Sequence, residues 1–144
     1  MAPMHVDVPR RGTVGLFGLL CCAVFLSGCQ PELLVALASE GEQLPSPGFV
    51  VTDPERPTER PRYTSIQVLQ QDGKTVWRAR AEPFGDLNSV ARFSYGQPPS
   101  GFVSVEGPEP LQAGRRYTVA VSGHKRGGMR FDVDAGGAVR VVRE

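Results

Sequence analysis

The chain has 144 residues, a formal net charge of +1 and three cysteines, and 40% of its residues are hydrophobic. This length suits one ordinary domain with a terminal extension. The near-neutral balance lacks the excess of basic residues that marks nucleic-acid-binding domains, so we expect no nucleic-acid partner.

The first 28 residues have the composition of a secretory signal. Two arginines precede an apolar run, Gly12 to Leu26, that contains no acidic residue, and two small residues follow it. At about 15 residues the run is shorter than a helix needs to cross a bilayer, roughly 20. We therefore expect a signal peptide over residues 1–28.

The signal ends in Leu26-Ser27-Gly28-Cys29. This order resembles the lipobox of bacterial lipoproteins, in which a leucine and two small residues precede a cysteine. The resemblance implies cleavage after residue 28 by a type II signal peptidase and lipidation of Cys29, with a diacylglyceryl group and further acylation such as palmitate. Several acyl chains give stable anchoring, whereas one chain binds marginally. The alternative is a plain signal peptide or an uncleaved anchor, with an incidental cysteine.

The residue after this cysteine is Gln30. In Gram-negative lipoproteins an aspartate there favours retention in the inner membrane. The resemblance therefore implies an envelope protein anchored by lipid in the outer membrane and facing the periplasm. Since Cys21 and Cys22 leave with the signal, no disulfide braces the mature chain, and packing must stabilise it.

A segment rich in proline and glutamate follows, over residues 29–61. Its end, DPERPTERP, suits neither a continuous helix nor a central strand. We expect a lipidated N-terminus and a flexible, charged tether. Two parts can depart from it: residues 48–52 are expected to form a first edge strand, and residues 32–39 are apolar enough for a short helix.

A β-sandwich domain is expected over residues 62–144. Apolar and polar side chains alternate there in short runs, most clearly in Arg116 to Ser122 and Met129 to Asp134. Asp72-Gly73 predicts a type I′ hairpin turn, and Ala135-Gly136-Gly137 predicts a bulged one. About seven strands without helical periodicity indicate an all-β fold of two antiparallel sheets.

The spacing of Leu111, Gly114 and Tyr117 in LQAGRRYTVAV resembles the tyrosine corner of fibronectin type III and related immunoglobulin-like domains. The resemblance implies that Gly114 eases a turn and that the Tyr117 ring enters the core, with its hydroxyl bonded to upstream backbone. Trp77 is a further structural residue. It follows a hairpin, unlike the early-strand tryptophan of fibronectin domains, so the strand order stays open between this fold and a transthyretin-like sandwich.

Catalytic chemistry has little support. His124 is the sole histidine after the signal and lies in the polar stretch SGHKRGG. No G-x-S-x-G motif accompanies it, and one histidine with an acylated cysteine cannot supply a zinc site. We predict no catalytic residue, cofactor or metal. The alternative is a small periplasmic hydrolase or enzyme inhibitor that uses the loop around His124.

Possible binding residues are cationic. Arg78 and Arg80 are expected to project together from one strand face, which suits lipid head groups, acidic glycans or an acidic protein. The competing interpretation is that such arginines protect the exposed sheet from edge pairing. Lys125 and Arg126 add charge beside glycines in the His124 loop.

Two aromatic residues are also candidates. Tyr95 and Phe102 stand among glycines and prolines, in a segment that begins at Phe84. They either form a rigid contact surface on loops or plug the ends of the sandwich. We therefore predict a membrane-anchored, non-enzymatic envelope lipoprotein whose sandwich is a binding or structural module for an envelope protein or a cell-wall polymer. Nothing in the sequence indicates an oligomeric state.

Overall fold

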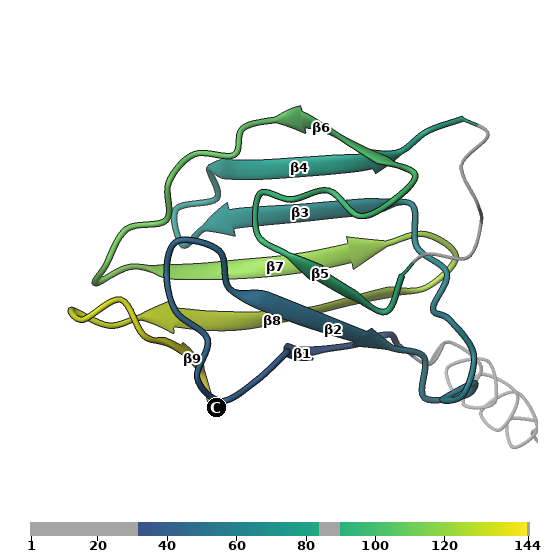
Figure 1. Cartoon of the computed structure of the whole chain (residues 1–144), viewed down its shortest axis with the longest axis horizontal. Coiled ribbons are helices and arrows are strands. Elements are labelled where there is room, and N and C mark those ends of the chain that lie inside the picture. Colours follow the sequence, from purple (N-terminus) through teal and green to yellow (C-terminus); the bar gives the residue numbers. More distant parts are fainter. Residues whose placement is uncertain (1–31, 84–89, 144) are drawn as a thin grey trace, which may run out of the picture. The chain divides into compact units, whose positions relative to one another are not determined.

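Two antiparallel sheets make up the computed structural model, which describes residues 32–83 and 90–143. One sheet has the order β1-β2-β5, with β1 (Leu34–Leu37), β2 (Gly48–Thr52) and β5 (Arg92–Ser94). The other has the order β6-β4-β3-β7-β8-β9 (Figure 1), with β6 (Phe102–Glu106), β4 (Thr75–Ala81), β3 (Ser65–Gln70), β7 (Arg116–Ser122), β8 (Arg126–Val133) and β9 (Val139–Val141). The described residues contain no helix. The predicted all-β sandwich is confirmed.

Local hairpins build much of the larger sheet. In the β3–β4 turn, the Gly73 N–H donates to the Gln70 carbonyl at 2.9 Å, and the Gln70 N–H donates to the Lys74 carbonyl at 2.8 Å. Gly73 has a φ of 92°, while no described residue other than glycine has a positive φ. The φ of Asp72 is therefore not positive, and the turn is not the predicted type I′, which requires positive φ at both central residues.

The smaller sheet comes largely from the segment predicted as a tether. β1 and β2 pair antiparallel, from Leu34 opposite Thr52 to Leu37 opposite Phe49. The sandwich therefore includes strands from residues 34–52, within the predicted tether. The strand expected at 48–52 is present as β2, but it is central in its sheet and not at an edge, and β1 lies where a short helix was the alternative. The physical reason is burial: Leu33, Phe49 and Val51 lie in the core, which outweighs the polar composition around them.

Aromatic rings fill the space between the sheets. The Phe49 ring of β2 lies 5.5 Å, centroid to centroid, from Phe93 in its own sheet and 5.5 Å from Phe131 in the other. Trp77 and Tyr95 meet edge to face at 5.4 Å and 69°. Such ring pairs add about 0.5–1.5 kcal/mol beyond the buried area. The two sheets thus share one core.

Tyr117 has the geometry of a tyrosine corner. Its ring is fully buried and stacks on Phe131 at 5.6 Å, and its hydroxyl oxygen accepts the Gln112 N–H at 2.9 Å. Gly114, with a φ of 78°, makes the turn between these residues, and Leu111 is buried at its start. A residue with a side chain would be strained at this φ.

The polar groups of two other buried aromatic side chains also form hydrogen bonds. The Trp77 Nε1–H donates to Ser104 Oγ at 3.0 Å, and the Tyr63 hydroxyl donates to the Val90 carbonyl at 2.7 Å. In the described part of the chain, no buried side-chain nitrogen or oxygen lacks a hydrogen bond. These buried polar groups are therefore already used for hydrogen bonds within the fold.

Candidate functional site

The outer face of the six-stranded sheet carries a row of polar side chains that crosses four strands. Arg80 of β4 lies opposite Ser65 of β3, Ser65 opposite Ser122 of β7, and Ser122 opposite Arg126 of β8. Arg80, Ser65 and Ser122 each have a buried neighbour in their strand, and register partners share a face, so Arg126 lies on the outer face as well. Both arginines are exposed. Since adjacent strands lie about 4.8 Å apart, the two arginine backbones are about 14 Å apart. We call this set the arginine–serine row.

The face is hollowed beside this row. Gln67, Ala120 and Gly128 form the next set of register partners on β3, β7 and β8. Because Ala120 is small and Gly128 has no side chain, a shallow groove of about 380 Å³ lies here, and Gln67, Ser122, Arg126 and Glu32 are among the residues that line it. The groove offers amide, hydroxyl and guanidinium groups for hydrogen bonds, beside a small apolar surface that includes Ala120 and Val121.

Other cations on this sheet are neutralised locally. Arg78 pairs with Glu106 across β4 and β6 at 3.0 Å. Arg116 holds Asp132 with two contacts, Nε to Oδ1 at 2.7 Å and a terminal nitrogen to Oδ2 at 3.1 Å. These hydrogen bonds lower the pKa of Asp132 and raise the pKa of Arg116. The predicted binding role of Arg78 is thereby weakened, because its charge already has a partner.

The two arginines of the row differ from these paired cations. Among residues 32–83 and 90–143, neither Arg80 nor Arg126 makes an ion pair. The sequence pattern identified both residues as candidates. It did not identify Ser65, Ser122 or the groove, because these depend on the register between strands far apart in the chain.

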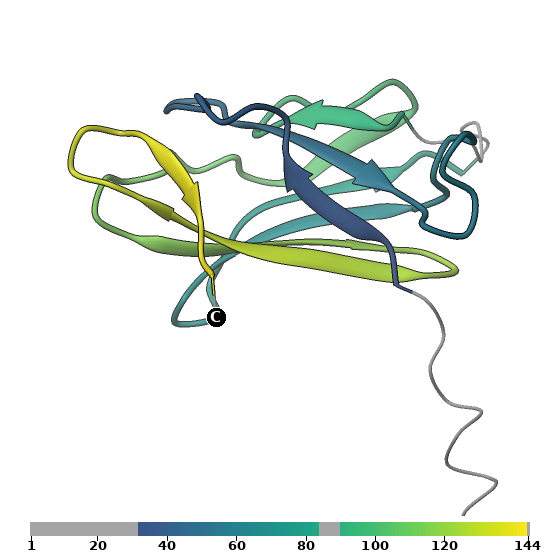
Figure 2. The same cartoon turned by 90° about the horizontal axis from the view of Figure 1, so that it is seen from below.

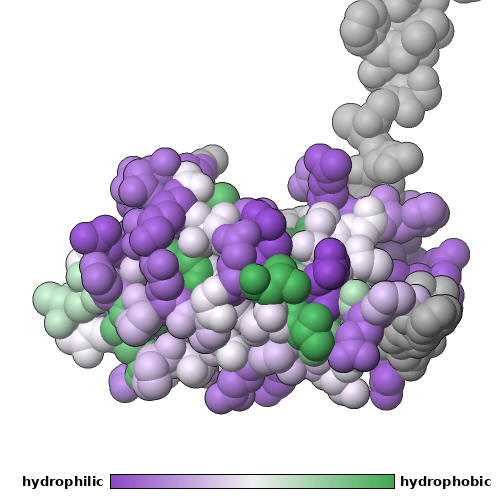
Figure 3. Space-filling model, turned by 90° about the horizontal axis from the view of Figure 1, so that it is seen from above, coloured by the Kyte–Doolittle hydropathy of each residue, from purple (hydrophilic) through white to green (hydrophobic). Residues whose placement is uncertain are grey.

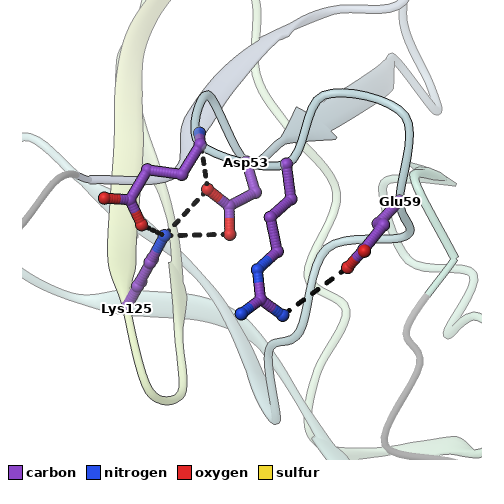
Figure 4. A network of polar contacts seen from close by, with 5 residues as sticks. Asp53, Glu59 and Lys125 are labelled. Atoms are coloured by element: carbon purple, nitrogen blue, oxygen red, sulfur yellow. Dashed lines mark hydrogen bonds and ion pairs between the residues drawn. The ribbon is translucent and has the colours of Figure 1, made fainter.

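Lys125 forms ion pairs within the molecule, although it is next to Arg126. Its Nζ contacts Asp53 Oδ1 at 2.8 Å, Asp53 Oδ2 at 3.0 Å and Glu55 Oε2 at 2.6 Å (Figure 4). The hydrogen bond from Lys125 lowers the pKa of Asp53, and the bonds to Asp53 and Glu55 raise the pKa of Lys125. Lys125 therefore joins the loop after β2 to the β7–β8 hairpin, and its predicted binding role is weakened because its charge already has partners.

The two aromatic candidates are part of the core. Tyr95 and Phe102 are only 3% and 7% exposed. The Tyr95 hydroxyl donates to the carbonyls of Val76 and Glu109, and burial raises its pKa. These rings plug the sandwich, so the contact-surface interpretation of Tyr95 and Phe102 is wrong. The part of that segment at residues 84–89 lies outside the described residues.

The surface on the β6 side is mostly polar. Figure 3, seen from this side, shows scattered apolar patches among hydrophilic side chains. The exposed apolar residues of β6 are Val103 and Val105, at 40% and 43%. Isolated exposed valines are common on protein surfaces and do not by themselves mark an interface.

His124 lies exposed between β7 and β8. No described residue forms a hydrogen bond or ion pair with it, so no carboxylate or hydroxyl in the described ranges prepares it for acid–base chemistry. Within the same ranges, no three His, Cys, Asp or Glu side chains gather as metal ligands. No helix of the described part is long and apolar enough to span a membrane. Cys29 and the predicted signal lie outside the described residues.

Comparisons with protein-family models, with curated proteins and with solved structures found no match. The functional assignment therefore depends on the chain's own residues.

Proposed function

We propose that this protein is a lipid-anchored, non-enzymatic binding module of the bacterial cell envelope. The support for the anchor is the sequence Leu26-Ser27-Gly28-Cys29 at the end of a signal-like segment. The support for the binding module is the arginine–serine row, whose two cations are exposed and unpaired among the described residues. The ligand that fits this face best is an acidic cell-wall polymer.

The chemistry of the groove favours such a polymer over a protein. Protein interfaces depend on aromatic or large apolar side chains buried at their centre. The centre of this face instead has Ala120, Gly128 and the polar side chains of Gln67, Ser65 and Ser122. Hydroxyl and amide groups between two arginines suit carboxylates and hydroxyls presented along an extended, hydrated chain.

Binding to purified peptidoglycan sacculi, measured by co-sedimentation of the detergent-solubilised protein, tests the face. The double variant Arg80→Gln, Arg126→Gln should bind about threefold to thirtyfold more weakly, because it loses two charge-assisted contacts. Arg92→Gln is the matched control, since Arg92 is exposed on the other sheet. Sacculi whose carboxylates have been amidated should bind poorly. Equal binding by the double variant would exclude the row as the site.

The anchor is tested separately through Cys29→Ser. This change removes the thiol that accepts lipid, so the variant should not fractionate with membranes in the absence of detergent. A serine variant that stays in the membrane fraction, with a mature N-terminus elsewhere, would contradict the lipoprotein assignment.

A further inference from the structure

A seam runs along one flank of the sandwich, between β1 and β9 (Figure 2). In the described structure each of these strands pairs with a neighbouring strand on one side only: β1 with β2, and β9 with β8. Backbone hydrogen bonds close the seam at both ends. The Leu33 N–H donates to the Arg126 carbonyl at 2.8 Å at one end, and the Val139 N–H donates to the Glu42 carbonyl at 2.9 Å at the other.

The middle of β1 directs unpaired backbone groups into the seam. In an antiparallel pair, alternate residues bond to the partner strand and the others point away from it. The Ala38 N–H bonds to the Gly48 carbonyl at 2.9 Å, so the residues of even number face β2. Val35 and Leu37 therefore present their N–H and carbonyl groups to the opposite side, as the Leu33 bond to β8 also indicates.

The edge of β9 that faces β1 also directs unpaired backbone groups into the seam. The Val142 N–H bonds to the Arg130 carbonyl at 3.0 Å, and the Asp134 N–H bonds to the Ala138 carbonyl at 2.9 Å. The even residues of β9 thus face β8, which leaves the backbone of Val141 directed into the seam. The bond from Val139 to Glu42 follows the same alternation.

The seam holds a groove of about 750 Å³. Its apolar wall includes Leu37, Val139 and Val141, and Val141 is 48% exposed. Its charged lining residues are Arg140, Arg143 and Glu40. Arg140 is 3.7 Å from Asp134, whereas Arg143 forms no ion pair with any residue in the described ranges. The groove therefore combines free strand edges, an apolar wall and an excess of positive charge.

We propose that the seam binds an extended acidic peptide segment of a partner protein, which adds one strand between β1 and β9. Unpaired edges are the surfaces that bind extended peptides by main-chain hydrogen bonds, with side-chain pockets for selectivity. A segment of four residues would match the length of β1. Its alternate side chains would be apolar, against Leu37 and Val141, and acidic, toward Arg140, while Arg143 adds positive charge just beyond the end of β9. This site is separate from the arginine–serine row.

Amide hydrogen exchange, followed by NMR on the full mature chain in detergent, provides the direct test. The probe is a capped heptapeptide of alternating valine and glutamate. On its addition, the amides of Leu37 and Val141 should exchange at least about tenfold more slowly. The amides of Ala38 and Val142 are internal controls, because they are already bonded within the sheets, and the peptide should change them little.

Two variants separate the backbone contribution from the charge contribution. Val141→Pro removes an N–H that faces the seam while keeping the bonds of β9 to β8, and it should weaken peptide binding about tenfold. Arg143→Glu should weaken binding of the glutamate peptide about threefold to tenfold, while Arg92→Glu, on an exposed strand elsewhere, should not.

Three results would overturn the proposal. One is equal binding of a valine–lysine peptide, and another is unchanged affinity in a folded Val141→Pro variant. The third is slow exchange at Leu37 and Val141 before any peptide is added, because the chain itself or a second copy would then fill the seam.

Discussion

The two sheets of the sandwich are built in different ways. The six-stranded sheet contains hairpins, in which β3 pairs with β4, β7 with β8 and β8 with β9 across short turns. The three-stranded sheet joins distant segments, since β2 pairs with β5 more than 40 residues later, at Phe49 opposite Phe93. Local alternation and turn residues specify the first sheet. The second exists because its apolar residues are buried against the first.

This difference shows that composition alone does not separate a tether from a domain. The segment around β1 and β2 is rich in proline and glutamate, yet Leu33, Phe49 and Val51 are 3%, 0% and 1% exposed. A few buried side chains contribute about 1.5–3 kcal/mol each and outweigh unfavourable local propensity. The two sheets should therefore depend on each other for stability.

Truncation is the strongest test of that dependence. A fragment that begins at Arg62 lacks β1 and β2 and exposes the core face of the larger sheet, so it should not fold. A fragment that begins at Pro31 should unfold in one cooperative urea transition, followed by circular dichroism. Cooperative unfolding of the shorter fragment would show that the six-stranded sheet is an independent domain.

Replacing one buried aromatic side chain in each sheet by alanine compares how much the two sheets contribute to the free energy of unfolding. Phe49→Ala in β2 and Tyr117→Ala in β7 each remove a fully buried ring, and each should lower the free energy of unfolding by about 3–5 kcal/mol. Urea midpoints of the 31–144 fragment measure both. A much smaller effect for Phe49→Ala would mean that the three-stranded sheet packs only loosely on its partner.

Removing only the hydroxyl group of the tyrosine corner should lower the free energy of unfolding by less. Tyr117→Phe keeps the ring and removes the oxygen that accepts the Gln112 N–H. Because Gln112 is exposed, water can replace that acceptor, and the loss should be about 1 kcal/mol. Loss comparable to that of Tyr117→Ala would indicate that the hydroxyl organises the whole turn. No loss at all would mean that the bond contributes nothing in solution.

The smallest effect is expected at the contact between Lys125 and the loop after β2. Lys125→Met should increase proteolysis within residues 53–61 and leave the sheets intact. Because the folded-state pKa of Asp53 is lowered from its ordinary 3.8, the pair stabilises the fold above that value, and its contribution falls as the pH drops through the lowered pKa. The difference between variant and parent in urea midpoint should therefore shrink from about pH 6 to about pH 3. A constant difference would exclude this ionic contribution.

Strands of the larger sheet could be predicted from the sequence, whereas the pairing of the charged side chains on its surface could not. Alternation located β7 and β8, and the spacing to Gly114 located the corner at Tyr117. The same local pattern treated Lys125 and Arg126 as equivalent. They differ because the hairpin turns Lys125 toward Asp53, a residue 72 positions away in the chain, while Arg126 extends from the outer face. Such distinctions depend on tertiary contacts, which local periodicity does not encode.

The hydrogen bond from Leu33 to Arg126 also limits how far the protein can reach. Leu33 is four residues after Cys29, and four residues of chain span at most about 14 Å. If Cys29 carries the lipid, this short connection keeps the folded domain close to the membrane surface. A polymer bound to the outer face would then be held at a distance set by the domain's own thickness.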